Sequence, residues 1–337
     1  MPDRYSRQEL FTPIGKEGQA LLSTKHVLIV GAGALGSANA EMLARAGIGK
    51  ITIIDRDYIE WSNLSRQHLY TEEDAMEVLS KAKAAEYHLK KINSEIDVNG
   101  IAEEFTPENA EALVKSADIV VDGTDNFSTR FIINDAAAKN GVPWVYGGCV
   151  QSHGVALPIR PGKTPCLECL IEHLPHEGET CDTVGIIGPA VQLAASYQTT
   201  ECLKHLTGHE MATDLVYFDV WKGDHSSINV TKLLNLQCPS CSVNATFPYL
   251  QKEKGMKTAV LCGRDTVQVR PVGGISSLSQ LRKRIASVTS KVKENQELLI
   301  FEIEGIRFVV FKDGRTLIHG INDADEAKKL YERYVGA

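Results

Sequence analysis

A glycine-rich segment offers the first chemistry in the sequence, because Gly31-Ala32-Gly33-Ala34-Leu35-Gly36 has the spacing G-x-G-x-x-G. Glycines at these positions permit a tight turn and let phosphate oxygens approach backbone N–H groups at the start of a helix. Asp55 follows about 20 residues later, where a carboxylate can accept hydrogen bonds from ribose hydroxyls. The pattern predicts a nucleotide site formed by Gly31, Gly33, Gly36 and Asp55. It does not distinguish NAD from ATP, and a turn that only packs a strand on a helix is the alternative.

Polar and charged side chains follow Asp55 at short spacing. Asn63 and Arg66 come within a dozen residues of it, and Lys81 lies a little further along. Two cations can clamp a triphosphate while an amide holds a phosphate oxygen. These residues therefore favour ATP, and ordinary surface charges are the alternative.

Asp125 and Asn126 follow a predicted strand at residues 119–121. Open α/β sheets bind their ligands at the carboxyl ends of the strands, so both residues are predicted to face the nucleotide. Mg²⁺ commonly binds one or two carboxylates together with phosphate oxygens. Asp125 is therefore the predicted magnesium ligand.

Four of the eight cysteines form two C-x-x-C pairs, Cys166 with Cys169 and Cys238 with Cys241. Each pair can present two thiolates to one tetrahedral zinc ion, and together they complete a closed site with no position for substrate or water. Such an ion would join segments remote in the sequence, which is a structural role. A redox dithiol and unrelated buried cysteines are the alternatives, but neither flank shows clearly the context of a thioredoxin-like pair.

Cys181 stands in a polar stretch that predicts an exposed loop at residues 178–185. Access and thiolate character make a cysteine reactive, and the start of the helix expected after this loop favours the thiolate. Cys181 is therefore the candidate nucleophile. Cys202 is predicted to lie in the core and Cys149 to pack near the nucleotide edge, while Cys262 receives no role.

Apolar runs and helical patterns alternate over the first 155 residues, which predicts a parallel sheet covered by helices. The expected strands are 26–30, 50–54, 97–101, 119–121 and 144–146, and the expected helices are 35–46, 81–92, 107–115 and 189–206. The fold class is thus α/β, with a Rossmann-like nucleotide-binding domain over residues 1–250 whose C-terminal part is stapled by zinc.

A second, smaller domain is predicted after a polar linker at residues 251–257. Strand runs near 258–270, 298–303, 306–311 and 315–318 combine with helices near 277–292 and 323–334. Residues 258–337 are therefore expected to form a small α+β domain, whose role the sequence does not indicate.

Composition sets the broad class of the protein. The 337 residues carry 36 Lys and Arg against 43 Asp and Glu, a net charge of −7. The protein therefore has no positive electrostatic field that would attract nucleic acid. No apolar run is long enough to span a bilayer, and the first residues lack the pattern of a secretory signal. We expect a cytoplasmic protein that binds neither nucleic acid nor membrane, with its cysteines reduced.

Several motifs together are specific. They are residues 4–8, the glycine segment, residues 62–67 and Thr124-Asp125-Asn126. In this order, over about residues 1 to 250, they resemble the signature of the ThiF/MoeB/HesA family, bacterial relatives of the ubiquitin-activating enzymes. The C-terminal domain resembles an extension found on some bacterial members.

The resemblance implies a role for each matching residue. Gly31, Gly33 and Gly36 would line the ATP phosphates and Asp55 would bind the ribose. Asn63, Arg66 and Lys81 would contact phosphates, Asp125 would hold Mg²⁺, and Arg7 would reach the nucleotide of a neighbouring subunit. The cysteines 166, 169, 238 and 241 would bind a structural zinc ion. Cys181 would attack the activated carrier or take part in sulfur transfer, and Arg130 matches a family position of unassigned role.

Two positions depart from the family pattern. The family often has Gln where Ser65 stands, which we expect to be harmless. It usually has Pro before the phosphate lysine, whereas this chain reads Ser80-Lys81-Ala82-Lys83. Lys81 is the predicted contact, and Lys83 remains its rival.

The activity implied by the resemblance is ATP-dependent adenylation of the C-terminal glycine of a ubiquitin-like sulfur carrier protein, with Mg²⁺ and release of pyrophosphate. Thiocarboxylate formation for thiamin thiazole or molybdopterin would follow, with a slight preference for the thiazole carrier. The implied partners are a carrier ending in Gly-Gly, a cysteine desulfurase as sulfur donor, and a second copy of the chain in a homodimer. The alternatives are an NAD-dependent oxidoreductase with a zinc module and an inactive carrier-binding protein.

Overall fold

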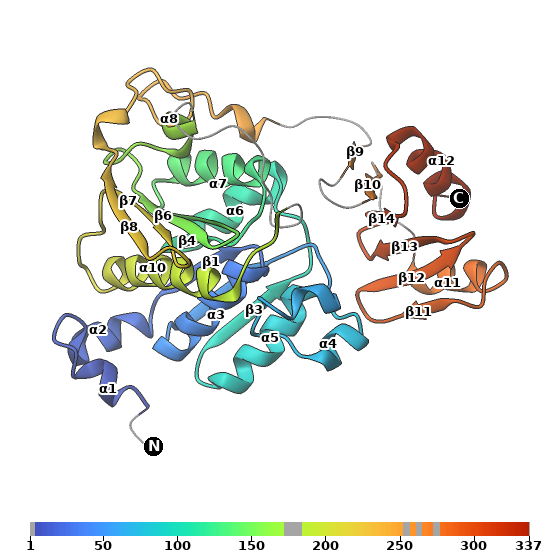
Figure 1. Cartoon of the computed structure of the whole chain (residues 1–337), viewed down its shortest axis with the longest axis horizontal. Helices are drawn as coiled ribbons and strands as arrows, with labels where there is room; N and C mark the ends of the chain where they lie inside the picture. Colours follow the sequence, from blue (N-terminus) through green and yellow to red (C-terminus); the bar gives the residue numbers. More distant parts are fainter. Residues whose placement is uncertain (1–3, 172–183, 252–256, 261–264, 272–276, 337) are drawn as a thin grey trace. The chain divides into compact units, whose positions relative to one another are not determined.

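The structure is a computed structural model that describes residues 4–171, 184–251, 257–260, 265–271 and 277–336. The chain divides into two compact units, Met1–Lys252 and Glu253–Ala337. Figure 1 shows the helices and strands of each unit, coloured along the chain.

An eight-stranded sheet forms the centre of the first unit, in the order β3-β2-β1-β4-β5-β6-β7-β8. Strands β1 to β5 pair in parallel, and β6, β7 and β8 continue the sheet antiparallel. The strands are β1 (His26–Val30), β2 (Lys50–Ile54), β3 (Asp97–Ile101), β4 (Ile119–Asp122), β5 (Trp144–Val150), β6 (His153–Ile159), β7 (Asp214–Asp219) and β8 (Asp224–Asn229). The predicted, largely parallel α/β sheet is confirmed, and its first five strands begin at the expected residues.

The three antiparallel strands are absent from the sequence-based prediction, for physical reasons. All residues of β8, which reads Asp-His-Ser-Ser-Ile-Asn, are exposed, so no apolar alternation marks this strand. The hairpin between β5 and β6 turns at Gln151 and Ser152, with Gln151 at a φ of 53°. Without glycine, asparagine or aspartate in the turn, the usual hairpin signal is missing.

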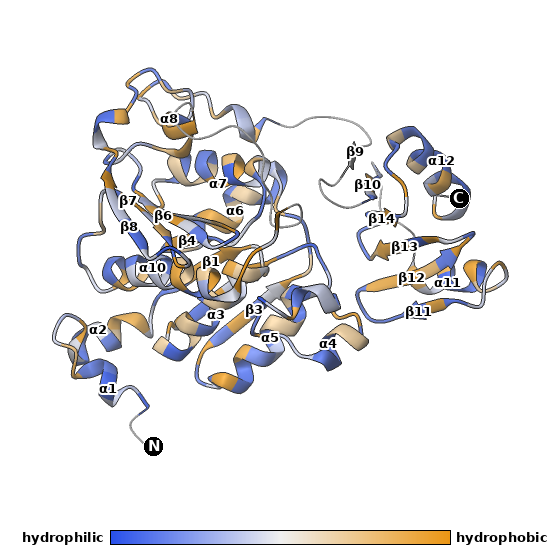
Figure 2. Ribbon diagram, in the orientation of Figure 1, coloured by the Kyte–Doolittle hydropathy of each residue, from blue (hydrophilic) through white to orange (hydrophobic). Residues whose placement is uncertain are grey.

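Helices cover both faces of this sheet (Figures 1 and 2). Along β1, Val27 and Ile29 join one hydrophobic core, whereas Leu28 and Val30 join the other, because successive side chains of a strand point to opposite faces. The first core is covered by α3 (Ala34–Ala46), α5 (Lys81–Ile92) and α10 (Gly188–Leu206), and the second by α6 (Pro107–Lys115) and α7 (Phe127–Asn140).

Local signals set the ends of these helices. Thr106 forms a capping box with Asn109 at the start of α6, and Pro107 occupies its first turn. Gly47 and Gly141 end α3 and α7 in the left-handed conformation, at φ angles of 83° and 68°. The remaining short helices include α1 (Ser6–Glu9), α2 (Gly15–Leu22), α4 (Glu72–Met76) and α8 (Leu167–Ile171).

The second unit contains a six-stranded antiparallel sheet in the order β11-β12-β13-β14-β10-β9. Its elements are β9 (Lys257–Val260), β10 (Thr266–Arg270), α11 (Leu278–Ile285), β11 (Val292–Glu294), β12 (Leu298–Ile303), β13 (Ile306–Phe311), β14 (Thr316–His319) and α12 (Ala324–Tyr334). The expected helix at 277–292 is too long. It ends at Ile285, because Val288-Thr289-Ser290 are weak helix formers and Val292–Glu294 pairs with β12 instead.

Among the described residues, no helix combines the length and apolar character needed to cross a membrane.

Candidate functional site

Two of the three motif glycines pack the turn between β1 and α3 against neighbouring backbone. Gly31 has a φ of 91°, and a Cβ there would lie 2.6 Å from the carbonyl oxygen of Gly123. A Cβ on Gly36 would lie 1.8 Å from the carbonyl oxygen of Gly31. Packing alone therefore requires glycine at positions 31 and 36.

Gly33 differs from the other two because no described residue would crowd a Cβ at this position. A Cβ there would lie 3.8 Å from the Gly123 oxygen and 4.0 Å from Gln67 Nε2, and its φ is −73°. Gly33 is the N-cap of α3, whose first-turn N–H groups have no partner within the helix. The space at Gly33 is therefore suited to a phosphate group.

Asp55 follows β2 beside this turn. Its two carboxylate oxygens accept the N–H groups of Ala32 and Asp57, each at 2.6 Å. Burial raises the pKa of Asp55, Lys81 opposes this rise and Asp57 adds to it. Asp55 thus fixes the backbone of the glycine turn, a role that the sequence did not indicate.

The rival lysines Lys81 and Lys83 lie in different surroundings at the start of α5. The Lys81 side chain is 7% exposed, and its Nζ lies 3.6 Å from Asp57 Oδ2. The Lys83 side chain is 45% exposed and pairs with Glu86 at 3.2 Å. The structure therefore brings Lys81, rather than Lys83, together with Asp55 and Asp57.

The segment after β2 presents two buried amides. Asn63 is 1% and Gln67 is 3% exposed, and within the described part of the chain Asn63 Nδ2 and Gln67 Oε1 have no hydrogen-bond partner. Burying an unpaired polar atom is costly, so both amides suit a polar ligand. Arg66 is half-buried and donates to the Ser62 carbonyl at 2.8 Å. The sequence does not predict Gln67 as a nucleotide contact, although Gln67 ends the motif at residues 62–67.

Asp125 and Asn126 follow β4 as expected, but their side chains are engaged differently. Asp125 is exposed at the carboxyl edge of the sheet. The Asn126 oxygen accepts the Thr129 N–H at 2.9 Å and caps α7, and its Nδ2 donates to Asp125 at 3.3 Å. The Asn126 side chain therefore serves mainly as the N-cap of α7, and its NH₂ group lies beside Asp125.

A buried ion pair lies behind this loop. Arg130 Nε donates to Asp122 Oδ2 at 2.9 Å, and its Nη2 donates to the carbonyls of Thr124 and Gly147 at 2.7 and 2.9 Å. Asp122 is 0% and Arg130 is 7% exposed. The pair therefore fixes the backbone immediately before Asp125, and the sequence identified neither this role nor Asp122.

Arg7 does not lie at the site of its own chain. The Tyr5 hydroxyl accepts a hydrogen bond from Asn93 Nδ2 at 2.9 Å, and the Tyr5 ring lies against Gly47, which ends α3. The 13 residues of α3 separate Gly47 from Gly33 by about 20 Å. Arg7 is exposed two residues after Tyr5, on the side of α3 that is remote from the glycine turn.

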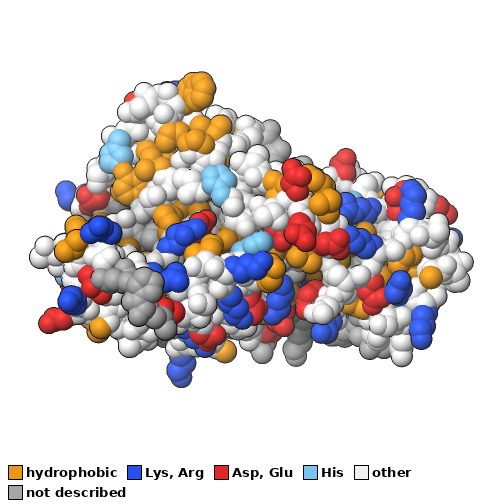
Figure 3. Space-filling model, turned by 90° about the horizontal axis from the view of Figure 1, so that it is seen from below, with side chains coloured by type: hydrophobic (Ala, Val, Ile, Leu, Met, Phe, Trp, Pro, Cys, Tyr) orange, Lys and Arg blue, Asp and Glu red, His pale blue; other side chains and the backbone are white. Residues whose placement is uncertain are grey.

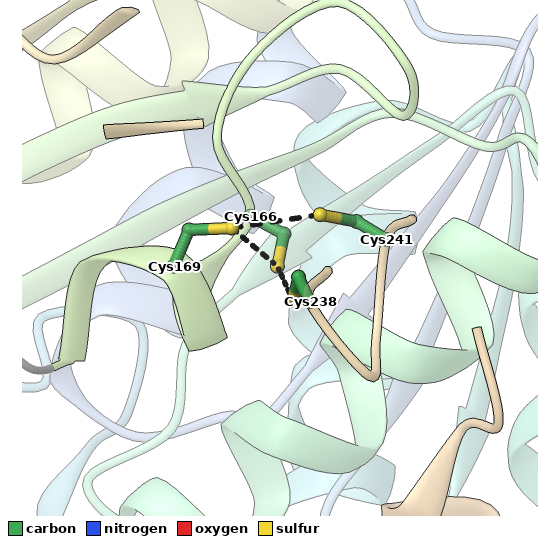
Figure 4. Close-up of side chains that lie close together, drawn as sticks. All are labelled: Cys166, Cys169, Cys238 and Cys241. Atoms are coloured by element: carbon green, nitrogen blue, oxygen red, sulfur yellow. Dashed lines mark hydrogen bonds between the residues drawn. The ribbon is translucent and has the colours of Figure 1, made fainter. Parts of the chain in front are cut away.

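Four cysteines converge although their pairs are far apart in the sequence (Figure 4). The sulfur of Cys166 lies 3.8 Å from that of Cys169 and 3.6 Å from that of Cys238, and Cys169 lies 3.5 Å from Cys241. A tetrahedron with Zn–S bonds of about 2.3 Å has edges of about 3.8 Å, whereas a disulfide needs about 2.05 Å. The four sulfurs therefore fit one tetrahedral metal ion.

Cys149 and Cys202 lie outside this cluster. Cys202 is buried in α10, as predicted, and Cys149 is half-buried with its sulfur 3.6 Å from the Ala190 carbonyl. Cys181 and Cys262, the candidate nucleophile and the cysteine without a role, lie outside the described residues.

Comparison with known proteins gives a consistent result. A family model described as the ThiF family matches residues 5–241. The chain is 48% identical, over its full 337 residues and the full length of the relative, to the Bacillus subtilis protein named "Sulfur carrier protein ThiS adenylyltransferase". It is 36% identical to the Thermus thermophilus "Sulfur carrier protein adenylyltransferase", with 72% of this chain and 92% of the relative covered.

A solved structure with bound nucleotide shares the fold. The crystal structure of E. coli MccB with ATP matches with a TM-score of 0.60 and 26% identity, over 72% of this chain and 74% of MccB. The family match covers well over half of the chain, and the identity to the Bacillus relative extends from end to end. The chain therefore belongs to the ThiF family.

Proposed function

We propose that the chain is an ATP-dependent adenylyltransferase for a ubiquitin-like sulfur carrier protein. It would join AMP to the C-terminal glycine of the carrier and release pyrophosphate. The observation that carries this proposal is the 48% identity, along the whole chain, to a protein named as the adenylyltransferase of the carrier ThiS. The same observation favours a ThiS-like carrier of the thiazole pathway over a molybdopterin carrier.

The site geometry supports this chemistry. Gly33 leaves room for phosphate at the start of α3, and the unpaired Asn63 Nδ2 can donate to a phosphate oxygen. Lys81 and Arg66 stabilise the charge that develops as pyrophosphate leaves. A free carboxylate is a poor acyl donor, so the step depends on positioning and charge stabilisation rather than on a general base.

Two further groups complete the proposed site. Asp125 would hold Mg²⁺, which supplies positive charge to the phosphates when bound. Asp55 would accept from the ribose, in addition to its bonds with Ala32 and Asp57. Arg7 lies far from the site of its own chain, which supports its proposed action on the nucleotide of a second subunit in a homodimer.

Sulfur transfer is the second half of the proposal. The activated carrier would receive sulfur from a donor persulfide, such as that of a cysteine desulfurase. The Cys181 thiolate would either displace AMP from the carrier to form a thioester, or accept the outer sulfur of the donor persulfide, which releases the donor thiol, and then displace AMP through that sulfur. The cysteines 166, 169, 238 and 241 would bind one Zn²⁺ ion, whose role is structural because all four positions around it are protein sulfurs.

ATP–pyrophosphate exchange tests the proposal directly. The purified, zinc-loaded protein is incubated with Mg²⁺, ATP, labelled pyrophosphate and, in turn, ThiS-like and MoaD-like carriers ending in Gly-Gly. We expect exchange that depends on the carrier and is fastest with a ThiS-like one. A folded protein that catalyses no exchange with any carrier would instead favour an inactive carrier-binding protein.

The oxidoreductase alternative makes a different prediction. It accounts for the glycine turn and Asp55 but gives no role to Asn63, Lys81 or Asp125. Hydride transfer with NAD that proceeds without ATP would support it, and family membership argues against it.

A further inference from the structure

Helix α7 contacts both the cysteine cluster and the loop that carries Asp125. The helix spans Phe127–Asn140 and directly follows that loop. Residues 134 and 135 lie one helical turn after Arg130, which is a distance of about 6 Å along the axis. One rigid element therefore connects two sites that are separate in the sequence.

Two adjacent side chains attach α7 to Leu167, within the first cysteine pair, and to Tyr249, eight residues beyond Cys241. Asn134 Oδ1 accepts the N–H of Leu167 at 2.8 Å, and Leu167 lies between Cys166 and Cys169. Asp135 Oδ2 accepts the N–H of Tyr249 at 2.8 Å. Asn134 is 1% and Asp135 is 0% exposed, so water cannot easily replace these hydrogen bonds. Breaking either bond would leave a buried polar group unpaired, which is energetically costly.

Tyr249 contacts both the helix and the segment that bears the first cysteine pair. Its ring stacks on Phe131 of α7, with 4.5 Å between ring centroids, and its hydroxyl donates to Glu168 at 3.0 Å. Glu168 also lies between Cys166 and Cys169. A metal ion that draws the two cysteine pairs together would therefore hold Leu167 against α7 directly. It would hold Tyr249 through the turn in which the Pro239 carbonyl accepts the N–H groups of Thr246 and Phe247.

One turn nearer its N-terminus, the same helix positions the nucleotide loop. Arg130 binds the Asp122 carboxylate and the carbonyls of Thr124 and Gly147, which surround the backbone leading to Asp125. A small rotation of α7 would move these contacts together, because the ion pair and the face of the helix that bears Asn134 and Asp135 are buried.

We propose that α7 couples metal binding at the four cysteines to Mg·ATP binding, with Asn134 and Asp135 as positioning residues that act through Arg130. The inference rests on the proposed function, because it requires nucleotide to bind beside Asp125. Coupling between two sites is reciprocal, so nucleotide raises the affinity for zinc by the same factor as zinc raises the affinity for nucleotide.

The first experiment uses the native full-length protein. Its zinc affinity is measured by competition with a chromophoric chelator, with and without Mg²⁺ and a non-hydrolysable ATP analogue. We expect the analogue to raise the zinc affinity by roughly fivefold or more. If the analogue binds but leaves the zinc affinity unchanged, the coupling is wrong and the proposed function stands. If the analogue does not bind at all, the proposed function itself fails.

A matched pair of variants then tests the route. Asn134→Ala removes the acceptor of the Leu167 N–H, whereas Asn140→Ala removes only a bond to the Ala136 carbonyl within the same helix. With zinc loaded, Asn134→Ala should lose most of the coupling factor and Asn140→Ala should retain it. Equal coupling in both variants would overturn the assignment to Asn134. If Asn134→Ala does not fold, the native-protein measurement still decides whether the two sites are coupled.

Discussion

At the residue scale, the two lysines at the start of α5 make opposite predictions. Lys81→Ala should lower the rate of ATP–pyrophosphate exchange by about 100-fold or more, because it removes a cation from the charge that develops on the phosphates. Lys83→Ala should leave the rate nearly unchanged, since Lys83 pairs with Glu86 on the exposed side of the helix. The exchange assay with both purified variants measures the difference. A large loss in Lys83→Ala alone would reverse the assignment.

Alanine substitutions at Gly33 and Gly36 should distinguish a role in nucleotide binding from a role in packing. Gly36→Ala places a Cβ 1.8 Å from the Gly31 oxygen and should lower the free energy of unfolding by about 3 kcal/mol or more. Gly33→Ala has room in the protein, so its stability should change by less than about 1 kcal/mol. Its ATP affinity should fall by about tenfold, because the added methyl group occupies the space expected for a phosphate. Urea unfolding and nucleotide titration distinguish the two effects. Unchanged ATP affinity in Gly33→Ala would show that phosphate does not approach this glycine.

Residue types and spacing anticipated which side chains gather at the nucleotide edge but not how each is held. Only the structure separates Lys81 from Lys83, since both lie on one short stretch of sequence and differ in the face of α5 that they occupy. The bonds of Asp55 to Ala32 and Asp57 were equally hidden. The ion pair of Asp122 and Arg130 joins a strand end to a helix, a contact that no local motif encodes.

At the scale of elements, the cysteine cluster joins α8 to the segment before residue 250. Cys238→Ala should abolish stoichiometric zinc binding and lower the free energy of unfolding by several kcal/mol, because a structural zinc site contributes its binding energy to folding. Cys149→Ala is the matched control, since this half-buried cysteine lies outside the cluster and should leave one zinc ion per chain. Metal analysis and thermal unfolding of both variants measure the outcome. A full zinc content in Cys238→Ala would exclude the four-sulfur site.

The elements that the sequence predicted are those with an internal pattern. Strands β1, β2 and β4 are nearly continuous apolar runs, β3 alternates buried and exposed residues, and the long helices carry apolar faces. These patterns predict the starts of β1 to β5 and the bounds of α5. Both faces of β8 are exposed, so its sequence carries no apolar signal. The sequence does not predict the strand β11, and the expected helix runs up to its first residue, Val292, because the pairing of β11 with β12 is a tertiary contact.

At the scale of the whole molecule, the two units should differ in their importance for adenylation. The family match ends at residue 241, within the first unit, and the Thermus relative covers 72% of this chain with 92% of its own length. A truncated chain of residues 1–252 should therefore fold and retain ATP–pyrophosphate exchange within about threefold of the full chain, because all the proposed nucleotide contacts lie in the first unit. Complete loss of exchange in a folded truncated protein would give the second unit a direct role.

The position of Arg7 leads to a prediction about the assembly. Arg7 lies beside the end of α3 that is about 20 Å from Gly33, so Arg7→Ala should impair exchange only if the arginine serves a second subunit. Mixing Arg7→Ala with Lys81→Ala subunits, each inactive alone, then regenerates one intact site in every mixed dimer. If subunits exchange at random, about half of the dimers are mixed, and each mixed dimer has one intact site out of two. About a quarter of the native rate should therefore return. Recovery should require conditions that let subunits exchange, and mixing two preparations of Lys81→Ala is the control. Exchange by Arg7→Ala at the native rate, or no recovery in dimers shown to be mixed, would place the site within a single subunit.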